Sequence, residues 1–134
     1  MRNKKVYLLL IVVILVMIIF VCSDFTDKRV VPVRVFISNA TGFDFEYNGL
    51  SFGQLQINQS ASRDMRIENT QGVKIKVMVK SSGEISKNII VSENNFYLNP
   101  GEVKNLTFSF YADGLSEYRE YKGEVEIVTK KWWI

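Results

Sequence analysis

The side chains that most often carry enzyme chemistry are nearly missing from this sequence. Its 134 residues contain no histidine and a single cysteine, Cys22. Serine or cysteine nucleophiles activated by histidine are therefore excluded, as are zinc, haem and iron–sulfur sites with histidine or cysteine ligands. A disulfide within the chain is excluded for the same reason. We expect no enzyme activity, no catalytic residue, no cofactor and no small-molecule substrate.

The remaining candidates for acid–base or metal chemistry are carboxylates in a polar segment over residues 111–121. Asp113, Glu117 and Glu120 offer oxygen ligands for calcium, but their spacing matches no known calcium loop such as the EF-hand. Two of them acting as a glycosidase pair would need a cleft, and so small a chain does not suggest one. We interpret these carboxylates as solvated charge and predict no metal site.

Aromatic side chains are the better candidates for binding. Tyr118 lies in the same polar segment, and tyrosines on loops often anchor a partner protein or stack on a sugar. Trp132, Trp133 and Ile134 follow two lysines. These three residues could dock on a neighbour's sheet edge, complete their own last strand or meet a membrane interface. We take these four residues as candidate partner-binding residues.

Three segments have the Asn-x-Ser/Thr pattern of an N-glycosylation acceptor, beginning at Asn39, Asn58 and Asn105. The pattern has meaning only if the domain is exported, and chance occurrence is the alternative. Asn105 alternates with apolar neighbours in a predicted strand, so we expect its side chain to be accessible.

The element that places these residues in a cell is the N-terminal segment. Arg2, Lys4 and Lys5 precede an unbroken apolar run over residues 6–22. These three basic residues account for the whole formal charge of +3, so the rest of the chain is neutral. The sequence pI of about 9.0 therefore does not indicate a nucleic-acid partner.

The apolar run has two interpretations, a retained membrane anchor or a cleaved signal peptide. We favour a single-pass anchor that contacts the membrane through residues 6–22, because the run exceeds a typical signal-peptide core of about 7–15 residues. Lipidation at Cys22 is disfavoured because bulky Val21 precedes it. The positive charges before the run predict a cytoplasmic N-terminus and a domain outside. The alternative is secretion after cleavage.

Beyond a short tether expected over residues 24–29, the hydrophobic period is two. Residues 31–37 and 73–80 alternate between apolar and other side chains, as a half-buried strand does. Residues 43–47 and 50–57 are further predicted strands, with a bulge at Gly53. Leu115 is expected to tuck under the sheet, and Tyr121 to begin the last strand.

Turn signals recur at intervals of about 8–12 residues, including Asn99-Pro100-Gly101. Seven to nine short strands at this spacing predict an all-β fold, an immunoglobulin-like β-sandwich. The predicted organisation is a signal or anchor helix over residues 1–23, the tether, and the sandwich over residues 30–134.

Four groups of residues in this region resemble the major-sperm-protein and Hydin-like branch of PapD-like immunoglobulin folds. They are Leu50-Ser51-Phe52-Gly53, Asn69, Leu98-Asn99-Pro100-Gly101 and Tyr121-Lys122-Gly123. The resemblance spans about residues 45–129 and implies a binding or scaffold module with no catalytic residue to carry over. The exported location differs from that of the cytosolic members, so no cytoskeletal role is carried over. Gly123 is expected to leave room beside an aromatic neighbour.

The sequence therefore predicts a non-enzymatic, membrane-anchored β-sandwich that binds other proteins of the cell envelope. Such a protein could serve as an accessory or stator-like subunit of a surface appendage, or as a cell-wall adaptor. One alternative is a structural subunit that self-assembles by strand exchange through residues 30–38 or the Trp-Trp-Ile segment. Another is a carbohydrate-binding module that uses Tyr118 and the two tryptophans.

Overall fold

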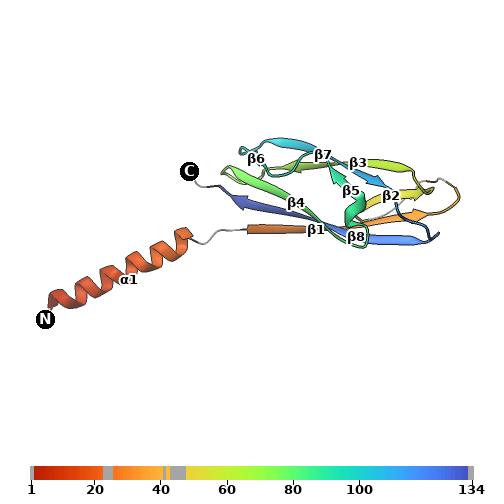
Figure 1. Ribbon diagram of the computed structural model, residues 1–134. Helices are drawn as coiled ribbons and strands as arrows, with labels where there is room; N and C mark the ends of the chain where they lie inside the picture. Colours follow the sequence, from red (N-terminus) through yellow and green to blue (C-terminus); the bar gives the residue numbers. More distant parts are fainter. Residues whose placement is uncertain (1, 23–25, 41, 43–47, 133–134) are drawn as a thin grey trace.

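The computed structural model describes residues 2–22, 26–40, 42 and 48–132. Within these residues one helix, α1 (Arg2–Cys22), precedes eight strands in two facing sheets (Figure 1). The five-stranded sheet has the order β2-β1-β8-β4-β6. Its strands are β1 (Thr26–Ile37), β2 (Leu50–Leu55), β4 (Ile75–Gly83), β6 (Phe96–Leu98) and β8 (Glu120–Lys131). The other sheet has the order β3-β7-β5. Its strands are β3 (Ser60–Glu68), β5 (Ile89–Val91) and β7 (Val103–Tyr111), and the short 3-10 helix η1 (Ser86–Asn88) precedes β5. The predicted β-sandwich behind one helix is confirmed.

Helix α1 is apolar on every side. Its window Asn3–Phe20 has a mean hydropathy of 2.3, and none of that window is buried within the described part of the chain. Its 21 residues span about 32 Å, which matches the roughly 30 Å hydrocarbon core of a bilayer. The helix is therefore long and apolar enough to cross a membrane, and a signal sequence would have the same properties.

Strand β1 begins earlier than the hydrophobic pattern indicates. Thr26 already pairs with Lys130 of β8, so residues 26–29 of the expected tether belong to the sheet. These residues are exposed and carry no apolar alternation, because a backbone ladder requires hydrogen bonds but not burial. Residues 23–25, between the helix and the strand, lie outside the described residues.

Strand β2 lies parallel to β1 and contains the predicted bulge. The register slips by one residue between Arg34 and Phe36 of β1, so β2 holds an extra residue there. Gly53 has a φ of 73°, a left-handed conformation that glycine adopts without a steric penalty. The strand ends at Leu55, before the predicted limit at residue 57. The predicted strand over residues 43–47 lies outside the described residues.

The core forms between the inward faces of the two sheets. From Val31 to Ile37 of β1 and from Ile75 to Val79 of β4 every second side chain is buried, as the alternating pattern predicts. Phe108 and Phe110 of β7 are fully buried, and the Phe110 ring lies 5.4 Å from that of Phe52, centroid to centroid. The other large apolar side chains that are fully buried among the described residues are Val33, Val35, Ile37, Val77, Ile85, Leu98, Leu106 and Val125.

Two glycines face each other where β4 meets β8. Gly83 pairs with Gly123, and Gly83 has a φ of 89°. A Cβ on Gly123 would lie 2.8 Å from the Ser82 carbonyl oxygen and 2.9 Å from Cγ1 of Ile85. Gly123 therefore makes room for a backbone and an isoleucine, and the expectation of an aromatic neighbour was wrong.

Asn69 is the one fully buried polar side chain among the described residues. Its Nδ2 donates to the carbonyl oxygens of Val73 at 2.9 Å and Leu98 at 3.0 Å. Its Oδ1 accepts from the backbone N–H of Gln71 at 2.9 Å. Its own backbone N–H and carbonyl bond to the turn between β6 and β7, through Glu102 and Gly101. Asn69 thus joins the β3–β4 loop to β6 and to the turn between β6 and β7.

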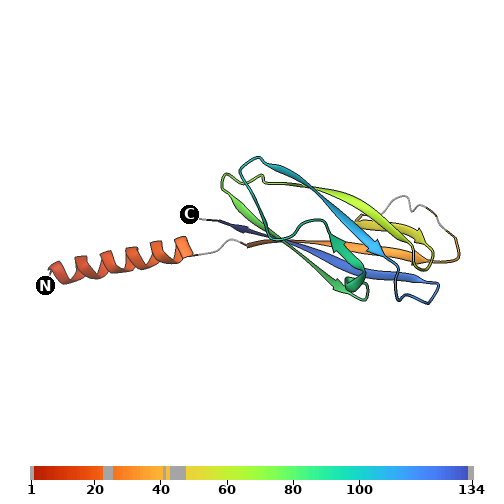
Figure 2. The same cartoon turned by 45° about the horizontal axis from the view of Figure 1, so that its top comes forward.

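The sandwich is elongated and has two distinct ends (Figure 2). We call the end that holds the start of β1 and the end of β8 the proximal end, because α1 leads into it. The opposite end, where β1 finishes at Ile37 and β8 begins at Glu120, is the distal end.

Candidate interaction surface

The loop between β7 and β8, residues 112–119, holds Tyr118 at the distal end. Ala112 is buried and its N–H donates to the Gln59 carbonyl at 2.8 Å. Leu115 packs against the core, and Tyr121 is buried at the start of β8, as the sequence predicts for both. The loop is therefore tied to the sandwich at both ends, and Tyr118 remains 65% exposed.

Arg119 organises the surface around Tyr118. Its guanidinium Nη2 lies 3.0 Å from Oε2 of Glu84, and its Nε lies 2.9 Å from Oε2 of Glu117. The guanidinium carbon lies 3.8 Å from the centroid of the Tyr121 ring, a cation–π contact. Because the Tyr121 hydroxyl donates to the Glu117 carbonyl at 3.2 Å, the cluster closes on itself.

The electrostatics of this cluster follow from those hydrogen bonds. The pKa of Glu84 is lowered by the bond from Arg119 and by a second bond, from the Lys122 backbone N–H at 3.0 Å. The pKa of Arg119 is raised, chiefly by Glu84 and next by Glu117. All these groups are exposed to solvent, which screens the ion pairs, so their main effect is to fix geometry.

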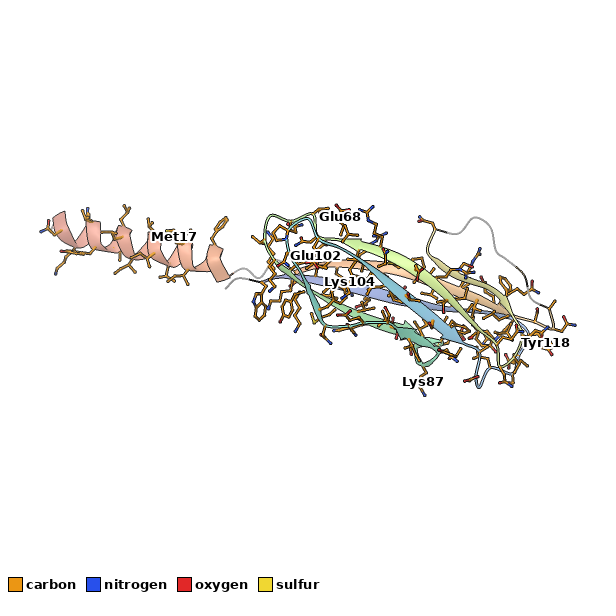
Figure 3. The ribbon with its side chains drawn as sticks, turned by 90° about the horizontal axis from the view of Figure 1, so that it is seen from above. Met17, Glu68, Lys87, Glu102, Lys104 and Tyr118 are labelled. Atoms are coloured by element: carbon orange, nitrogen blue, oxygen red, sulfur yellow. The ribbon has the colours of Figure 1, made fainter. Side chains whose placement is uncertain are left out.

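Tyr118 therefore projects into solvent beside an ionic cluster whose geometry is fixed by its hydrogen bonds. Figure 3 shows it at the far end of the sandwich from α1. An aromatic side chain with two rotatable bonds, carried on an ordered loop, loses little entropy when a partner covers it. The surface formed by Tyr118, Arg119, Glu84 and Glu117, here called the distal surface, is thus suited to binding a protein.

Two of the carboxylates considered for metal or acid–base chemistry, Glu117 and Glu120, are held in ion pairs. Glu117 pairs with Arg119, and Glu120 lies 3.2 Å from Lys122 Nζ. The Asp113 backbone carbonyl accepts a bond from Asn88. Within the described ranges no three Asp, Glu or Cys residues are grouped so as to hold a metal ion.

Trp132 lies at the proximal end, at the other end of β8 from Tyr118. Its backbone N–H donates to the Lys74 carbonyl at 2.9 Å, which continues the pairing with β4, and the residue is 41% exposed. Twelve residues of β8 separate the two aromatics by about 40 Å. Trp132 and Tyr118 therefore belong to separate surfaces. Trp133 and Ile134 lie outside the described residues.

All three sequon asparagines are exposed. Asn58 sits in a turn with a φ of 64°, whereas Asn105 lies within β7, opposite Arg66. Thr107, the third residue of the Asn105 sequon, donates its hydroxyl to Asp64 at 2.7 Å. The third residue of the Asn39 sequon lies outside the described residues.

The sequence did not predict a lateral groove that lies between the two sheets. It has a volume of about 300 Å³, opens between β4 and β5, and is lined by Val79, Ser81, Ile89, Ile90, Val91, Asn94, Phe108 and Val125. Strand β5 is the edge of its sheet, and beyond Val77 no described strand pairs with β4 on that side. Ile90 is 57% exposed, and this apolar residue at an outward position was the signal in the sequence.

No protein-family model matches this chain, and no curated protein matches it. The resemblance to PapD-like domains therefore stays a prediction.

Proposed function

We propose that this chain is a non-enzymatic, membrane-anchored binding module that presents its sandwich outside the cell to another envelope protein. Helix α1 is the anchor in this proposal, and Arg2, Lys4 and Lys5 keep the N-terminus in the cytoplasm by the positive-inside rule. The lack of histidine and the single cysteine support a binding role over a catalytic one.

The exposed Tyr118 on the ordered distal surface carries this proposal. Its 65% exposure is the largest of any aromatic side chain of the described sandwich. Because the ion pairs of Arg119 already hold the loop, binding would require little reorganisation. The partner in this proposal has an apolar pocket for the tyrosine, rimmed by charges that complement Glu84 and Glu117.

Site-specific photocrosslinking on intact membranes tests the partner surface. The full chain carries p-benzoylphenylalanine in place of Tyr118, or in place of Tyr111 as a matched control, since Tyr111 is an exposed tyrosine of β7. We expect one envelope protein to be captured from position 118, and its capture to fall at least tenfold in the Arg119→Ala background. Equal capture from both positions, or none from position 118, would contradict the distal surface as the binding site.

The proposed topology has its own test. When the full chain is made with eukaryotic microsomes, a domain in the lumen meets the glycosylation machinery at Asn58 and Asn105. We expect a glycosidase-sensitive mass increase that is reduced by Asn58→Gln. Modification of neither site, together with protease cleavage of the domain from outside the microsomes, would place the domain on the cytoplasmic side.

Self-assembly by strand addition is a second candidate, and the groove between β4 and β5 favours it. Its apolar lining and the neighbouring strand edges are features that an added strand uses. Donation of β1 would first have to break eleven residue pairs with β8. Light scattering of the detergent-solubilised chain decides this point. A polymer dispersed by Ile90→Glu supports self-assembly, whereas a monomer of the unchanged chain refutes it.

A further inference from the structure

Aromatic and basic side chains gather on the outer face of the five-stranded sheet at its proximal end. The rings of Tyr97 and Trp132 meet edge to face, with centroids 5.3 Å apart. The Nζ atoms of Lys74 and Lys76 lie 5.2 and 5.9 Å from the Tyr97 centroid. Tyr97 and Trp132 are each 41% exposed. We call these four residues the proximal face.

The covalent path keeps this face close to the end of α1. Cys22 ends the helix and Thr26 begins β1, so four Cα steps separate them, at most about 14 Å. Thr26 pairs with Lys130, Lys130 with Lys76, and Lys76 with Tyr97, one row across four strands. Neighbouring strands lie about 4.8 Å apart, so the whole row extends about 14 Å sideways from the start of β1.

The charge of this face is basic. Lys130 of β8 pairs with Lys76 and lies on the same outer face, whereas Lys131 pairs with the buried Ile75 on the other face of the sheet. The nearest described acidic residue of β1, Asp27, lines the space between the two sheets together with Arg29. Its carboxylate is thus directed away from the outer face. Figure 3 shows Glu68, the last residue of β3, and Glu102, in the turn before β7, also at the proximal end.

We propose that the proximal face binds the anionic lipid headgroups of the membrane in which α1 is anchored. This inference rests on the proposed anchoring of the chain. Tryptophan and tyrosine concentrate at the headgroup level of bilayers because their rings are apolar and their N–H and O–H groups are polar. Lysines near an anionic surface add an attraction that decays within a Debye length, about 8 Å at physiological salt.

This contact would fix the orientation of the domain relative to the membrane. A membrane anchor at one end does not by itself fix the inclination of the sandwich to the bilayer. A second contact on one sheet face holds the long axis at one inclination. The distal surface is then directed away from the bilayer at a set height, where a partner can reach it.

The chain supplies its own probe for this contact, because its two tryptophans are Trp132 and Trp133. The full chain is reconstituted into phosphatidylcholine vesicles with or without phosphatidylglycerol, each with a spin-labelled headgroup lipid as quencher. Acrylamide serves as the quencher from the aqueous side. In the anionic vesicles we expect blue-shifted emission, strong quenching by the headgroup label and weak quenching by acrylamide.

Reversing the charge of the lysines tests whether the proximal face binds anionic lipid or only lies near the membrane. Loss of each lysine lowers the ratio of membrane-bound to detached domain by about fivefold, from about 1 kcal/mol per lysine near an anionic surface. Lys74→Glu with Lys76→Glu is therefore expected to abolish the headgroup quenching. Lys80→Glu with Lys87→Glu, the same change farther from the proximal end, is expected to leave it intact. In the unchanged chain, raised salt is expected to weaken the quenching, which tests the contact even if the double variant fails to fold.

Vesicle flotation distinguishes the two levels of failure. A chain that floats with the vesicles but whose tryptophans are quenched by acrylamide alone overturns the headgroup contact and leaves the anchor in place. A chain that does not float overturns the anchor, and with it this inference. Quenching that is equal in neutral and anionic vesicles and insensitive to salt also overturns the role of anionic lipid.

Discussion

Removing the side chain of Asn69 gives the sharpest test of how this sandwich is held together. In Asn69→Ala the carbonyl oxygens of Val73 and Leu98 and the N–H of Gln71 each lose a partner. The Leu98 bond is buried, and an unsatisfied buried group costs about 1–3 kcal/mol. The other two bonds are partly buried and contribute about 0.5–1.5 kcal/mol each. Together these losses come to about 2–6 kcal/mol, so we expect the free energy of unfolding to fall by about 4 kcal/mol.

Urea unfolding of the full chain in detergent micelles, followed by tryptophan fluorescence, measures this loss. For a slope of about 1.5 kcal/mol per molar urea, a loss of about 4 kcal/mol lowers the midpoint by about 2.7 M. The matched control is Asn99→Ala, because Asn99 is exposed and its Nδ2 donates only to Glu102. Its expected cost is within about 0.5 kcal/mol. Equal midpoints for the Asn69 and Asn99 variants would refute the assignment of stability to the buried bonds.

A second substitution at the same site has a pH signature. Asn69→Asp places a carboxyl oxygen against two carbonyl oxygens, so burial raises its pKa above the unfolded value of about 4. The folded state then binds the proton more tightly than the unfolded state. The variant is expected to be most stable below that unfolded value and to lose stability as the pH rises through the raised folded pKa. A pH-independent difference from the unchanged chain would contradict this reasoning.

Three further outcomes are expected. Gly123→Ala should destabilise by about 1–3 kcal/mol in urea, because its Cβ meets the backbone at 2.8 Å, whereas Gly72→Ala, with nothing within 4 Å, should not. Phe108→Ala should cost about 3–5 kcal/mol by the same assay, since that ring is fully buried, and a cost below about 1 kcal/mol would contradict its place in the core. Because folding lowers the pKa of Glu84, this carboxylate makes a small contribution to the free energy of unfolding. The contribution is present above the pKa of Glu84 in the unfolded chain, and it is lost as the pH falls through the pKa of Glu84 in the folded chain. Glu84→Gln should remove that slope from a titration of the unfolding midpoint, and an unchanged slope would contradict the link to Arg119.

The strands with one wet face could be predicted from the sequence, because burial of every second side chain leaves a period of two. Strand β4 is an example, and α1 was predicted from its unbroken apolar run. The full length of β3 could not be predicted. It lies at a sheet edge and only Ile67 among its residues is buried, so the apolar signal in the sequence is confined to Met65 and Ile67. Strand order was also beyond the sequence, since the parallel pairing of β1 with β2 depends on the whole chain.

The candidate site was predicted only in part. Tyr118 was singled out as an aromatic residue in a polar segment, and it is exposed. The support beneath it was not predicted, because Glu84 lies 35 positions from Arg119 and pairs with it only after β4 and β8 are neighbours. Trp132 and Tyr97 meet for the same reason, through strands that are distant in sequence.

The antiparallel pairing of β1 with β8 also determines how the domain responds to force. Helix α1 joins β1 at the proximal end, and the distal loop joins β8 at the opposite end. A pull between a membrane anchor and a partner on Tyr118 therefore draws the two strands along each other in opposite directions. All eleven residue pairs of this ladder share that load in shear, instead of opening one by one like a zipper. The connection between the two ends of the molecule is thus built to resist tension, and its lifetime under load would follow the rate of forced unfolding.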